Sequence, residues 1–366
     1  MRLILKVLNA EWILKKPYKK DVLIYDKKSS DFADLFFKKK SCEFLCVRFE
    51  SINLYIIYIT LLKSGFKNFK DNYKKNFIER VSPKIVFTAI DNNPAFYNLK
   101  NIIQKPIYIS LQNGMRDNQF YEQCKILIKK KRMKLKADYI FLFGESEKKR
   151  FSKIIKGKIS CIGNAINNHY KFNSKNIKKK IRSIMYVSQY NISMFEREKH
   201  PIDTFEEDKK IFNKLNTFCN KKNIKLIFCS KVGRSLENFF REKFSKGKWI
   251  YYPRESRHKT YKRLNEQQMV VFGYSTLGFE ALAKGLRCVS FYKNFPIEGS
   301  YLRYPKSGSF WTDSLRYSDF ENILNKVINF SNKNWKMISN KYSEQILSYN
   351  PGNTKVKKIL NRILEV

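Results

Sequence analysis

The segment from Val271 to Phe291 has the residue types best suited to chemistry, because a turn of glycine, serine and threonine joins an apolar run to a helical pattern. The backbone N–H groups at a helix N-terminus and the helix dipole both favour an anion such as a phosphate. In this turn, Ser275 and Thr276 can hydrogen-bond a phosphate or cap the helix. The turn is therefore a candidate phosphate site, and an ordinary capped helix between two strands is the alternative.

A second polar turn follows the apolar run 84–90 in the first half of the chain. Asp91, Asn92 and Asn93 stand there in sequence, before Pro94. A strand that ends at this point places three short polar side chains at the carboxyl edge of a sheet. Asp91 is then a candidate general base or carboxylate nucleophile. The alternative is that Asp91 or Asn93 caps the next helix, with Pro94 in its first turn.

Polar residues also follow the next apolar run, 106–111. Around Gly114, the side chains of Gln112, Asn113 and Arg116 supply hydrogen-bond donors suited to sugar hydroxyls or a carboxylate. Asn113 and Gly114 also form a common turn sequence. Because two successive strands end in polar side chains, the pattern predicts an acceptor or transfer site.

The elements that must position these turns alternate along the chain as apolar runs and helical stretches, which is typical of parallel α/β architecture. In such sheets, ligands bind beyond the carboxyl ends of the strands. Strands are predicted over 21–25, 44–48, 84–90, 106–111, 139–143, 183–188, 224–230, 249–252, 269–272 and 287–291. Helices are predicted over 51–65, 71–81, 205–221, 236–244, 276–284 and 355–365. The pattern predicts two Rossmann-like domains facing a central cleft.

The lysine-rich polar stretch 171–182 gives the clearest domain boundary in the sequence. The predicted organisation is a first Rossmann-like domain over 1–168, a basic linker over 169–182 and a second Rossmann-like domain over 183–350. A C-terminal helix over 351–366 is expected to pack on the first domain.

The chain is strongly basic, with 74 Lys and Arg against 32 Asp and Glu in 366 residues and a formal net charge of +42. Such a charge invites a nucleic-acid interpretation. The lysines are dispersed, however, and no zinc-finger spacing, RNP-type motif or basic zipper accompanies them. Drift toward AT-rich codons is the alternative explanation for part of the excess, since Asn, Ile, Phe and Tyr are also abundant. The charge therefore favours anionic membrane surfaces or anionic substrates over specific nucleic-acid recognition.

Neither a metal site nor a membrane span is expected. The seven cysteines and three histidines show no ligand spacing. The longest apolar run, 52–62, is far shorter than the ~20 residues that cross a bilayer, and the start is too short for a signal peptide. We expect a cytoplasmic protein that works at the inner face of the cytoplasmic membrane.

Five short motifs resemble one known family. They are Asp91-Asn-Asn-Pro-Ala-Phe-Tyr97, Gln112-Asn-Gly-Met-Arg116, Gly163-Asn-Ala-Ile-Asn-Asn168, Tyr186-Val-Ser-Gln189 and Ser275-Thr-Leu-Gly-Phe-Glu280. In this order they resemble the bacterial surface carbohydrate (surface polysaccharide) biosynthesis family. That family is similar to GT-B glycosyltransferases, including retaining Kdo transferases of capsule and lipopolysaccharide assembly. The resemblance covers residues 84–291. It implies that the second domain binds a nucleotide sugar, that the first binds the acceptor, and that Asp91 is the catalytic carboxylate.

Residues near other strand ends of the second half complete the implied donor site. Ser188 and Gln189 would contact phosphate, and Lys231 and Arg234 would neutralise it. Arg254 and His258 would hold the base, whereas Glu280 would bond ribose hydroxyls. For each of them, the alternative is an ordinary solvated side chain. The full predicted set is catalytic Asp91, Asn92 and Asn93; acceptor-binding Gln112, Asn113, Gly114 and Arg116; and nucleotide-sugar-binding Ser188, Gln189, Lys231, Arg234, Arg254, His258, Tyr274, Ser275, Thr276, Leu277 and Glu280.

Together these features predict a metal-independent glycosyltransferase without a cofactor. It would transfer a sugar, such as Kdo or a related ulosonic acid, from a nucleotide-sugar donor to a bacterial surface glycan or glycolipid. With a CMP-linked ulosonic acid, Asp91 would form a covalent intermediate, and with a hexose nucleotide it would act as a base. One alternative is a non-hydrolysing nucleotide-sugar epimerase, which needs no acceptor. The other is a basic nucleic-acid-binding protein, which would bind arbitrary DNA or RNA with a steep salt dependence.

Overall fold

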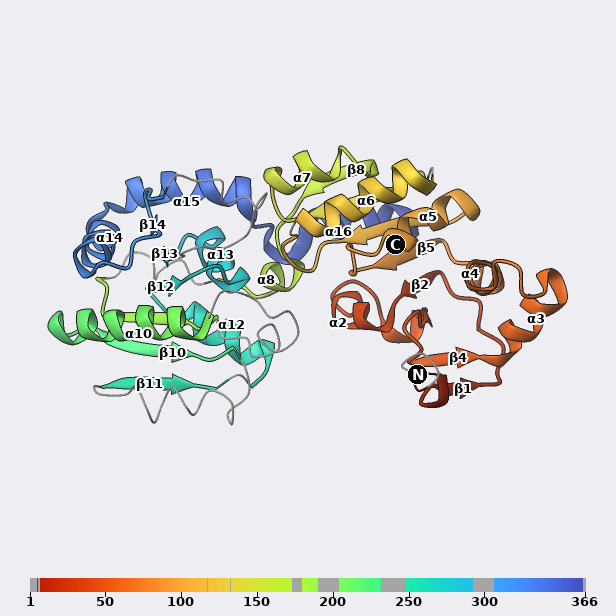
Figure 1. Cartoon of the computed structure of the whole chain (residues 1–366), viewed down its shortest axis with the longest axis horizontal. Coiled ribbons are helices and arrows are strands. Elements are labelled where there is room, and N and C mark those ends of the chain that lie inside the picture. The colour runs from red at the N-terminus through yellow and green to blue at the C-terminus, as the bar shows by residue number, and fades with distance from the viewer. Residues whose placement is uncertain are drawn as a thin grey trace. The chain divides into compact units, whose positions relative to one another are not determined.

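The computed structural model describes residues 5, 7–116, 118–131, 133–172, 180–189, 204–231, 248–253, 255–291 and 306–364. The chain folds as two compact units, each built around its own sheet (Figure 1). Unit 1 consists of residues 1–169 and 350–366, and unit 2 of residues 170–349. The last segment of the chain therefore belongs to the unit with which the chain begins.

The main sheet of unit 1 is parallel and has six strands in the order β3-β2-β5-β6-β7-β8. Every residue of β2 and of β5 is buried, as expected for strands covered on both faces. The chain order reverses between β2 and β5, so their carboxyl ends border a topological switch point, where sheets of this kind bind ligands. The strands are β2 Val22–Tyr25, β3 Cys42–Leu45, β5 Ile85–Thr88, β6 Ile107–Leu111, β7 Lys136–Leu142 and β8 Lys156–Cys161.

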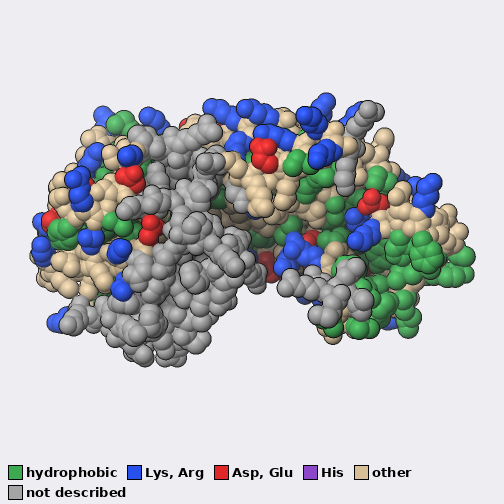
Figure 2. Space-filling model, viewed as in Figure 1, with side chains coloured by type: hydrophobic (Ala, Val, Ile, Leu, Met, Phe, Trp, Pro, Cys, Tyr) green, Lys and Arg blue, Asp and Glu red, His purple; other side chains and the backbone are tan. Residues whose placement is uncertain are grey.

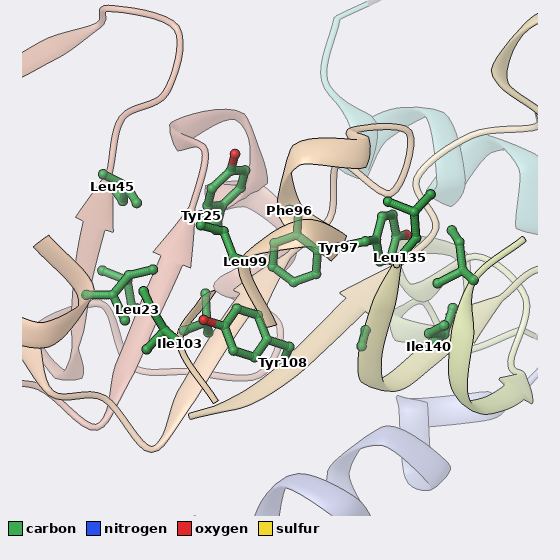
Figure 3. Close-up of a cluster of buried hydrophobic side chains, with 14 of the residues drawn as sticks. Leu23, Tyr25, Leu45, Phe96, Tyr97, Leu99, Ile103, Tyr108, Leu135 and Ile140 are labelled. Atoms are coloured by element: carbon green, nitrogen blue, oxygen red, sulfur yellow. The ribbon is translucent and has the colours of Figure 1, made fainter. Parts of the chain in front are cut away.

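Helices cover this sheet and supply much of the core. In Figure 3, Phe96 and Leu99 from α5 (Pro94–Ile102) lie against the sheet residues Tyr25 and Tyr108. The rings of Phe96 and Tyr25 meet edge to face with centroids 5.4 Å apart. The other helices of unit 1 are η1 Lys27–Ser29, α2 Ser30–Ala33, η2 Lys39–Ser41, α3 Leu54–Ser64, α4 Phe69–Val81, α6 Asn118–Lys131, α7 Glu145–Phe151, α8 Ala165–His169, η4 Pro351–Asn353 and α16 Thr354–Leu364.

Two three-residue strands form a small separate sheet in unit 1. Strand β1 (Glu11–Ile13) pairs in parallel with β4 (Ser51–Asn53). The helix predicted over 51–65 therefore begins later than expected. Asn53 sets its start, because the Oδ1 atom of Asn53 accepts a hydrogen bond from the Ile56 N–H at 3.0 Å.

Three buried asparagines join the end of the chain to the rest of unit 1. The Asn353 side chain donates to the Ala165 carbonyl at 2.9 Å and accepts from the Asn168 amide at 3.0 Å. The Asn168 carbonyl oxygen in turn accepts from the Asn350 backbone N–H at 2.9 Å. Helix α16 follows directly, with Val356 and Leu360 buried.

Unit 2 has a second six-stranded parallel sheet, in the order β11-β10-β9-β12-β13-β14. This is the Rossmann order, with its switch point between β9 and β12. The strands are β9 Ser183–Val187, β10 Lys225–Cys229, β11 Trp249–Tyr252, β12 Met269–Phe272, β13 Arg287–Phe291 and β14 Trp311–Thr312. The helices are α10 Thr204–Lys221, α12 Arg257–Asn265, α13 Thr276–Ala283, α14 Tyr317–Asn329 and α15 Asn332–Ile346.

The predicted α/β class with two Rossmann-like sheets is confirmed. Among the predicted strands, the bounds 44–48 are the least accurate, because β3 runs from Cys42 to Leu45. The helix predicted over 236–244 lies outside the described residues. No helix in the described part of the chain is both long and apolar enough to cross a membrane.

Candidate functional sites at the carboxyl edges of the two sheets

Asp91 lies at the carboxyl edge of the unit 1 sheet, just after β5, and its side chain is fully buried. The Arg116 Nε donates to Asp91 Oδ2 at 2.7 Å, and Arg116 Nη2 donates to Oδ1. The Asn113 backbone N–H also donates to Oδ1, at 3.1 Å. Both carboxylate oxygens of Asp91 are thus engaged within the protein.

Hydrogen bonds also fix the backbone around this carboxylate. The Tyr97 hydroxyl donates to the Asp91 carbonyl at 2.9 Å and hydrogen-bonds with the Ser110 hydroxyl at 2.8 Å. The Ala89 N–H donates to the Ser29 hydroxyl at 2.9 Å. Side chains from three neighbouring segments therefore hold the ends of β2, β5 and β6 together.

Gln112 extends this network to the next strand. Its Oε1 accepts from the Phe143 N–H at 2.7 Å, and its Nε2 donates to the carboxylate of Glu147 at 3.3 Å. Glu147 is fully buried and also accepts from the Tyr121 hydroxyl at 2.7 Å. Burial raises the pKa of Glu147 to about 7. A carboxyl group that titrates near neutral pH thus lies behind the Asp91–Arg116 pair.

Sequence reasoning missed two buried acids of this edge, Glu147 and Asp26. Asp26 follows β2, and its Oδ2 accepts from the Nε of Arg48 at 2.6 Å. Glu147 lies in α7, which begins after only Phe143 and Gly144 have followed the end of β7. The sequence does contain a signal for Glu147, because the charged sequence Glu145-Ser-Glu147 follows the predicted strand 139–143.

For Asn93, the capping alternative is confirmed, because its Oδ1 accepts from the Ala95 N–H at 3.1 Å and Pro94 begins α5. Asn92 is exposed. The ion pair of Asp91 with Arg116 favours a structural role for that carboxylate. Its predicted catalytic role stays a prediction.

A cavity of about 820 Å³ lies in unit 1 beside the same edge. Most of its lining is apolar, and the polar lining includes Asn92, Asn93 and the cations Arg48, Lys70 and Lys74. The apolar lining includes Val7, Trp12, Tyr25, Leu45, Val47, Phe49, Ile52, Ile57, Phe69 and Ile90. Such a cavity suits a ligand with both an apolar and an anionic or hydroxyl-rich part.

In unit 2, Gln189 crosses the switch point of the sheet. It follows β9, and its Oε1 accepts from the Tyr274 N–H, after β12, at 2.6 Å. Gly273 makes this contact possible, because a Cβ there would lie 1.9 Å from Gln189 Nε2. Lys231, after β10, donates to the Gln189 carbonyl at 3.3 Å. Three strand ends thus converge on one residue, through its side chain and its backbone carbonyl.

A buried carboxylate, Asp208 in α10, supports this edge from within. It accepts from the Gln189 N–H and from the Ser188 hydroxyl, each at 3.1 Å, and from the Tyr186 hydroxyl. Burial raises the pKa of Asp208 to about 6. The Ser188 hydroxyl is therefore directed to Asp208. Asp208 was not predicted from the sequence, because it acts from a helix 19 residues beyond Gln189.

Helix α13 begins next to Gln189. Ser275 occupies its N-cap position, and its side chain makes no capping hydrogen bond. Ser275, Thr276 and Leu277 are half-buried. The turn therefore combines a helix N-terminus with hydroxyl side chains at the switch point, as the sequence predicts for a phosphate site.

Other predicted donor residues lie in a second cluster of unit 2. Glu280 is buried and accepts from the Tyr261 hydroxyl at 2.6 Å. His258 is exposed on α12, and its ring lies 5.6 Å from that of Tyr170, which stacks on Tyr261. This geometry favours a structural role for Glu280. Arg234 and Arg254 lie outside the described residues.

Within the described ranges, no group of three or more His, Cys, Asp or Glu side chains could hold a metal ion.

The family is shown by a match over residues 109–364, more than half of the chain, to a family model described as "putative O-antigen biosynthesis protein". The chain belongs to this family. The predicted resemblance to surface carbohydrate biosynthesis proteins is thereby confirmed. No curated protein sequence matches the chain.

Solved structures share the fold at low sequence identity. The UDP-GlcNAc 2-epimerase of Neisseria meningitidis, bound to UDP-GlcNAc, is 11% identical with a TM-score of 0.54, covering 97% of this chain and 99% of its own. S. aureus MnaA with UDP is 12% identical with a TM-score of 0.51, covering 95% and 98%. The wall teichoic acid polymerase TagF is 11% identical with a TM-score of 0.52, covering 95% and 90%. The O-antigen family member described here therefore has a GT-B-type fold.

Proposed function

We propose that this protein is a glycosyltransferase that moves a sugar from a nucleotide donor to a glycan or glycolipid of O-antigen assembly. The observation that carries the proposal is the edge of unit 2, where Gln189, Lys231 and the N-terminus of α13 converge at the switch point. Family membership supports the pathway, and relatives of the same fold hold UDP or UDP-GlcNAc.

The donor phosphate would bind to the backbone N–H groups and the Ser275 and Thr276 hydroxyls at the N-terminus of α13, where residues 275–277 are half-buried. Lys231 would add positive charge. As the sugar leaves, these groups would stabilise the charge that develops on the phosphate, without a metal ion. The candidate donors are a CMP-linked ulosonic acid such as Kdo and a UDP-linked sugar.

The acceptor would occupy the cavity of unit 1 beside Asn92. Its apolar lining and its cations suit a glycolipid better than a free sugar. Such an acceptor would lie in a membrane, and we place the enzyme at the inner face of the cytoplasmic membrane. To act as a base or nucleophile, Asp91 would have to leave its ion pair with Arg116.

The test is thermal stabilisation of the purified protein by CMP, UDP, GDP and their sugar conjugates. A ligand that binds the native state raises stability by an amount set by its concentration over its Kd. We expect a selective shift with one nucleotide, and loss of that shift in Ser275→Ala/Thr276→Ala. The matched control is Ser331→Ala, which removes the N-cap bond of α15 in the same unit. It lowers the melting temperature but keeps the shift.

A shift with polyanions and none with any nucleotide would overturn the proposal and favour the nucleic-acid alternative. Product analysis then separates the two enzyme classes. An epimerase converts the nucleotide sugar without an acceptor, whereas the proposed transferase releases the nucleotide only when a lipid-linked acceptor is present.

A further inference from the structure

Exposed large apolar side chains gather in one part of unit 1. Of the thirteen among the described residues, nine lie before residue 67, and the other four are scattered over α5, α6, β11 and α15. Figure 2 shows hydrophobic side chains gathered over the region of α3, β1 and β4. We call the following six the apolar face: Trp12, Leu14, Tyr58, Leu61, Leu62 and Phe66.

Helix α3 is apolar on the side where a surface helix is normally polar. Only Ile56 and Thr60 of its eleven residues are buried, yet the first nine residues include no charged one. Its exposed side carries Tyr58, Leu61 and Leu62. A helix of eleven residues is too short to span a bilayer, so its apolar side needs another kind of partner.

The turn after α3 presents an aromatic ring. Gly65 ends the helix at φ 54° and ψ −139°, a conformation that favours glycine. Phe66 follows and is 86% exposed, the most exposed large apolar side chain among the described residues. The backbone therefore holds this ring out from the unit.

Lysines without acidic neighbours in sequence flank the apolar face. Residues 54–70 contain Lys63, Lys67 and Lys70 and no Asp or Glu, and residues 12–20 contain four lysines and no acid. The ammonium group of Lys16 lies 5.2 Å from the centre of the Tyr55 ring on α3. Apolar and aromatic side chains beside lysines are the composition of segments that lie in the interface of an anionic membrane.

We propose that the apolar face docks on a lipid bilayer that contains anionic lipids. The Leu62 and Phe66 side chains enter the boundary between headgroups and acyl chains, and Lys63 and Lys67 contact the headgroup phosphates. Charge decides against a second copy of this chain as the occupant, because two copies would bring like-charged lysines together. This docking rests on the membrane location in the proposed function and names the surface that makes the contact. Its test needs neither donor nor acceptor, so the two can fail separately.

The experiment measures binding of the full chain to sedimented vesicles of phosphatidylcholine, with and without phosphatidylglycerol. We expect binding to the anionic vesicles that weakens with salt. Leu62→Ser/Phe66→Ser should weaken it about tenfold or more, since both side chains lose burial in lipid. Lys63→Gln/Lys67→Gln should weaken binding to anionic vesicles by a similar factor. The matched control, Ile126→Ser/Met337→Ser, removes exposed apolar side chains from α6 and α15 and should bind like the wild type.

Several outcomes would overturn the proposal. Equal binding of all variants, or no binding by the wild type, excludes docking through this face. If light scattering shows a dimer that Leu62→Ser/Phe66→Ser separates, the face joins two copies instead. Because the substituted side chains are exposed, unchanged melting temperatures are expected and serve as the folding control.

Discussion

The ion pair between Asp91 and Arg116 decides how the unit 1 edge is to be tested, because a residue can be essential for structure or for chemistry. Asp91 is fully buried and Arg116 largely so. Removing one partner of a buried pair leaves the other charge without compensation, which costs several kcal/mol. If the role of Asp91 is structural, its substitution should lower stability, and any loss of activity should follow from that loss.

We expect Asp91→Asn to lower the free energy of unfolding in urea by about 3 kcal/mol. The double variant Asp91→Asn/Arg116→Met should recover part of that loss, since it removes the unpaired charge. The control is Asp71→Asn, whose pair with Lys74 on α4 is half-exposed and worth at most about 1 kcal/mol. Wild-type stability with abolished sugar transfer in Asp91→Asn would instead support the catalytic role.

Glu147 predicts a pH dependence with a defined sign. Its pKa is raised from 4.5 to about 7 in the folded protein, chiefly by burial. Folding therefore favours the protonated form, and the stabilisation present below pH 4.5 is lost as pH rises through 7. Relative to Glu147→Gln, which cannot ionise, the wild type should lose about 2 kcal/mol between pH 5 and pH 8.

The measurement is urea unfolding of both proteins at the two pH values, so that groups common to both cancel. The side-chain amide of the Glu147→Gln variant can still accept the hydrogen bond from Tyr121, which keeps the comparison close to isosteric. A difference in stability that stays constant with pH would show that Glu147 titrates outside this range.

Sequence reasoning found the residues at both sheet edges but not what they bond to. Apolar runs that end in polar turns locate Asp91, Gln112, Gln189 and Tyr274. That Gln189 reaches Tyr274, 85 residues away, depends on β9 and β12 being neighbours in the sheet. Such contacts depend on strand order, which a local pattern does not specify.

At the scale of elements, buried apolar strands were predictable. Strand β8, whose six residues are exposed or half-buried, and the very short strands were not. Strands β1 and β4 have three residues each, too few for a period of two to be read. Helix α3 had the apolar composition expected of a core helix, although the fold leaves most of it half-buried or exposed. Periodicity predicts the element; it does not predict what covers the element.

The asparagine contacts of the C-terminal segment predict a large effect from one substitution. Asn353 is buried, adopts φ 57° and makes two side-chain hydrogen bonds within unit 1. Asn353→Ala should destabilise unit 1 by about 2–3 kcal/mol, through the lost bonds and the positive φ. Asn340→Ala on α15 is the matched control, because Asn340 is exposed on a helix and should tolerate alanine. Equal effects would contradict the proposed importance of this contact.

At the scale of the whole molecule, two units with separate sheets should unfold as separate cooperative transitions. In scanning calorimetry, Asn353→Ala should lower only the unit 1 transition. Gly273→Ala should lower only that of unit 2, because its Cβ would displace the Gln189 side chain. The donor nucleotide should raise only the unit 2 transition. A single transition that responds to all three changes would contradict this independence.

The return of the chain to unit 1 has a consequence for synthesis on the ribosome. Residues 170–349 are translated before residues 350–366, yet Asn350, Asn353 and α16 complete unit 1. Until they emerge, Asn168 and the surface that Val356 and Leu360 cover have no partner from this segment. Unit 1 therefore remains incomplete while the whole of unit 2 is synthesised. A chaperone that binds the nascent chain would act during that interval. A stop codon near residue 349 would remove the C-terminal segment of unit 1, although most of unit 1 lies at the other end of the chain.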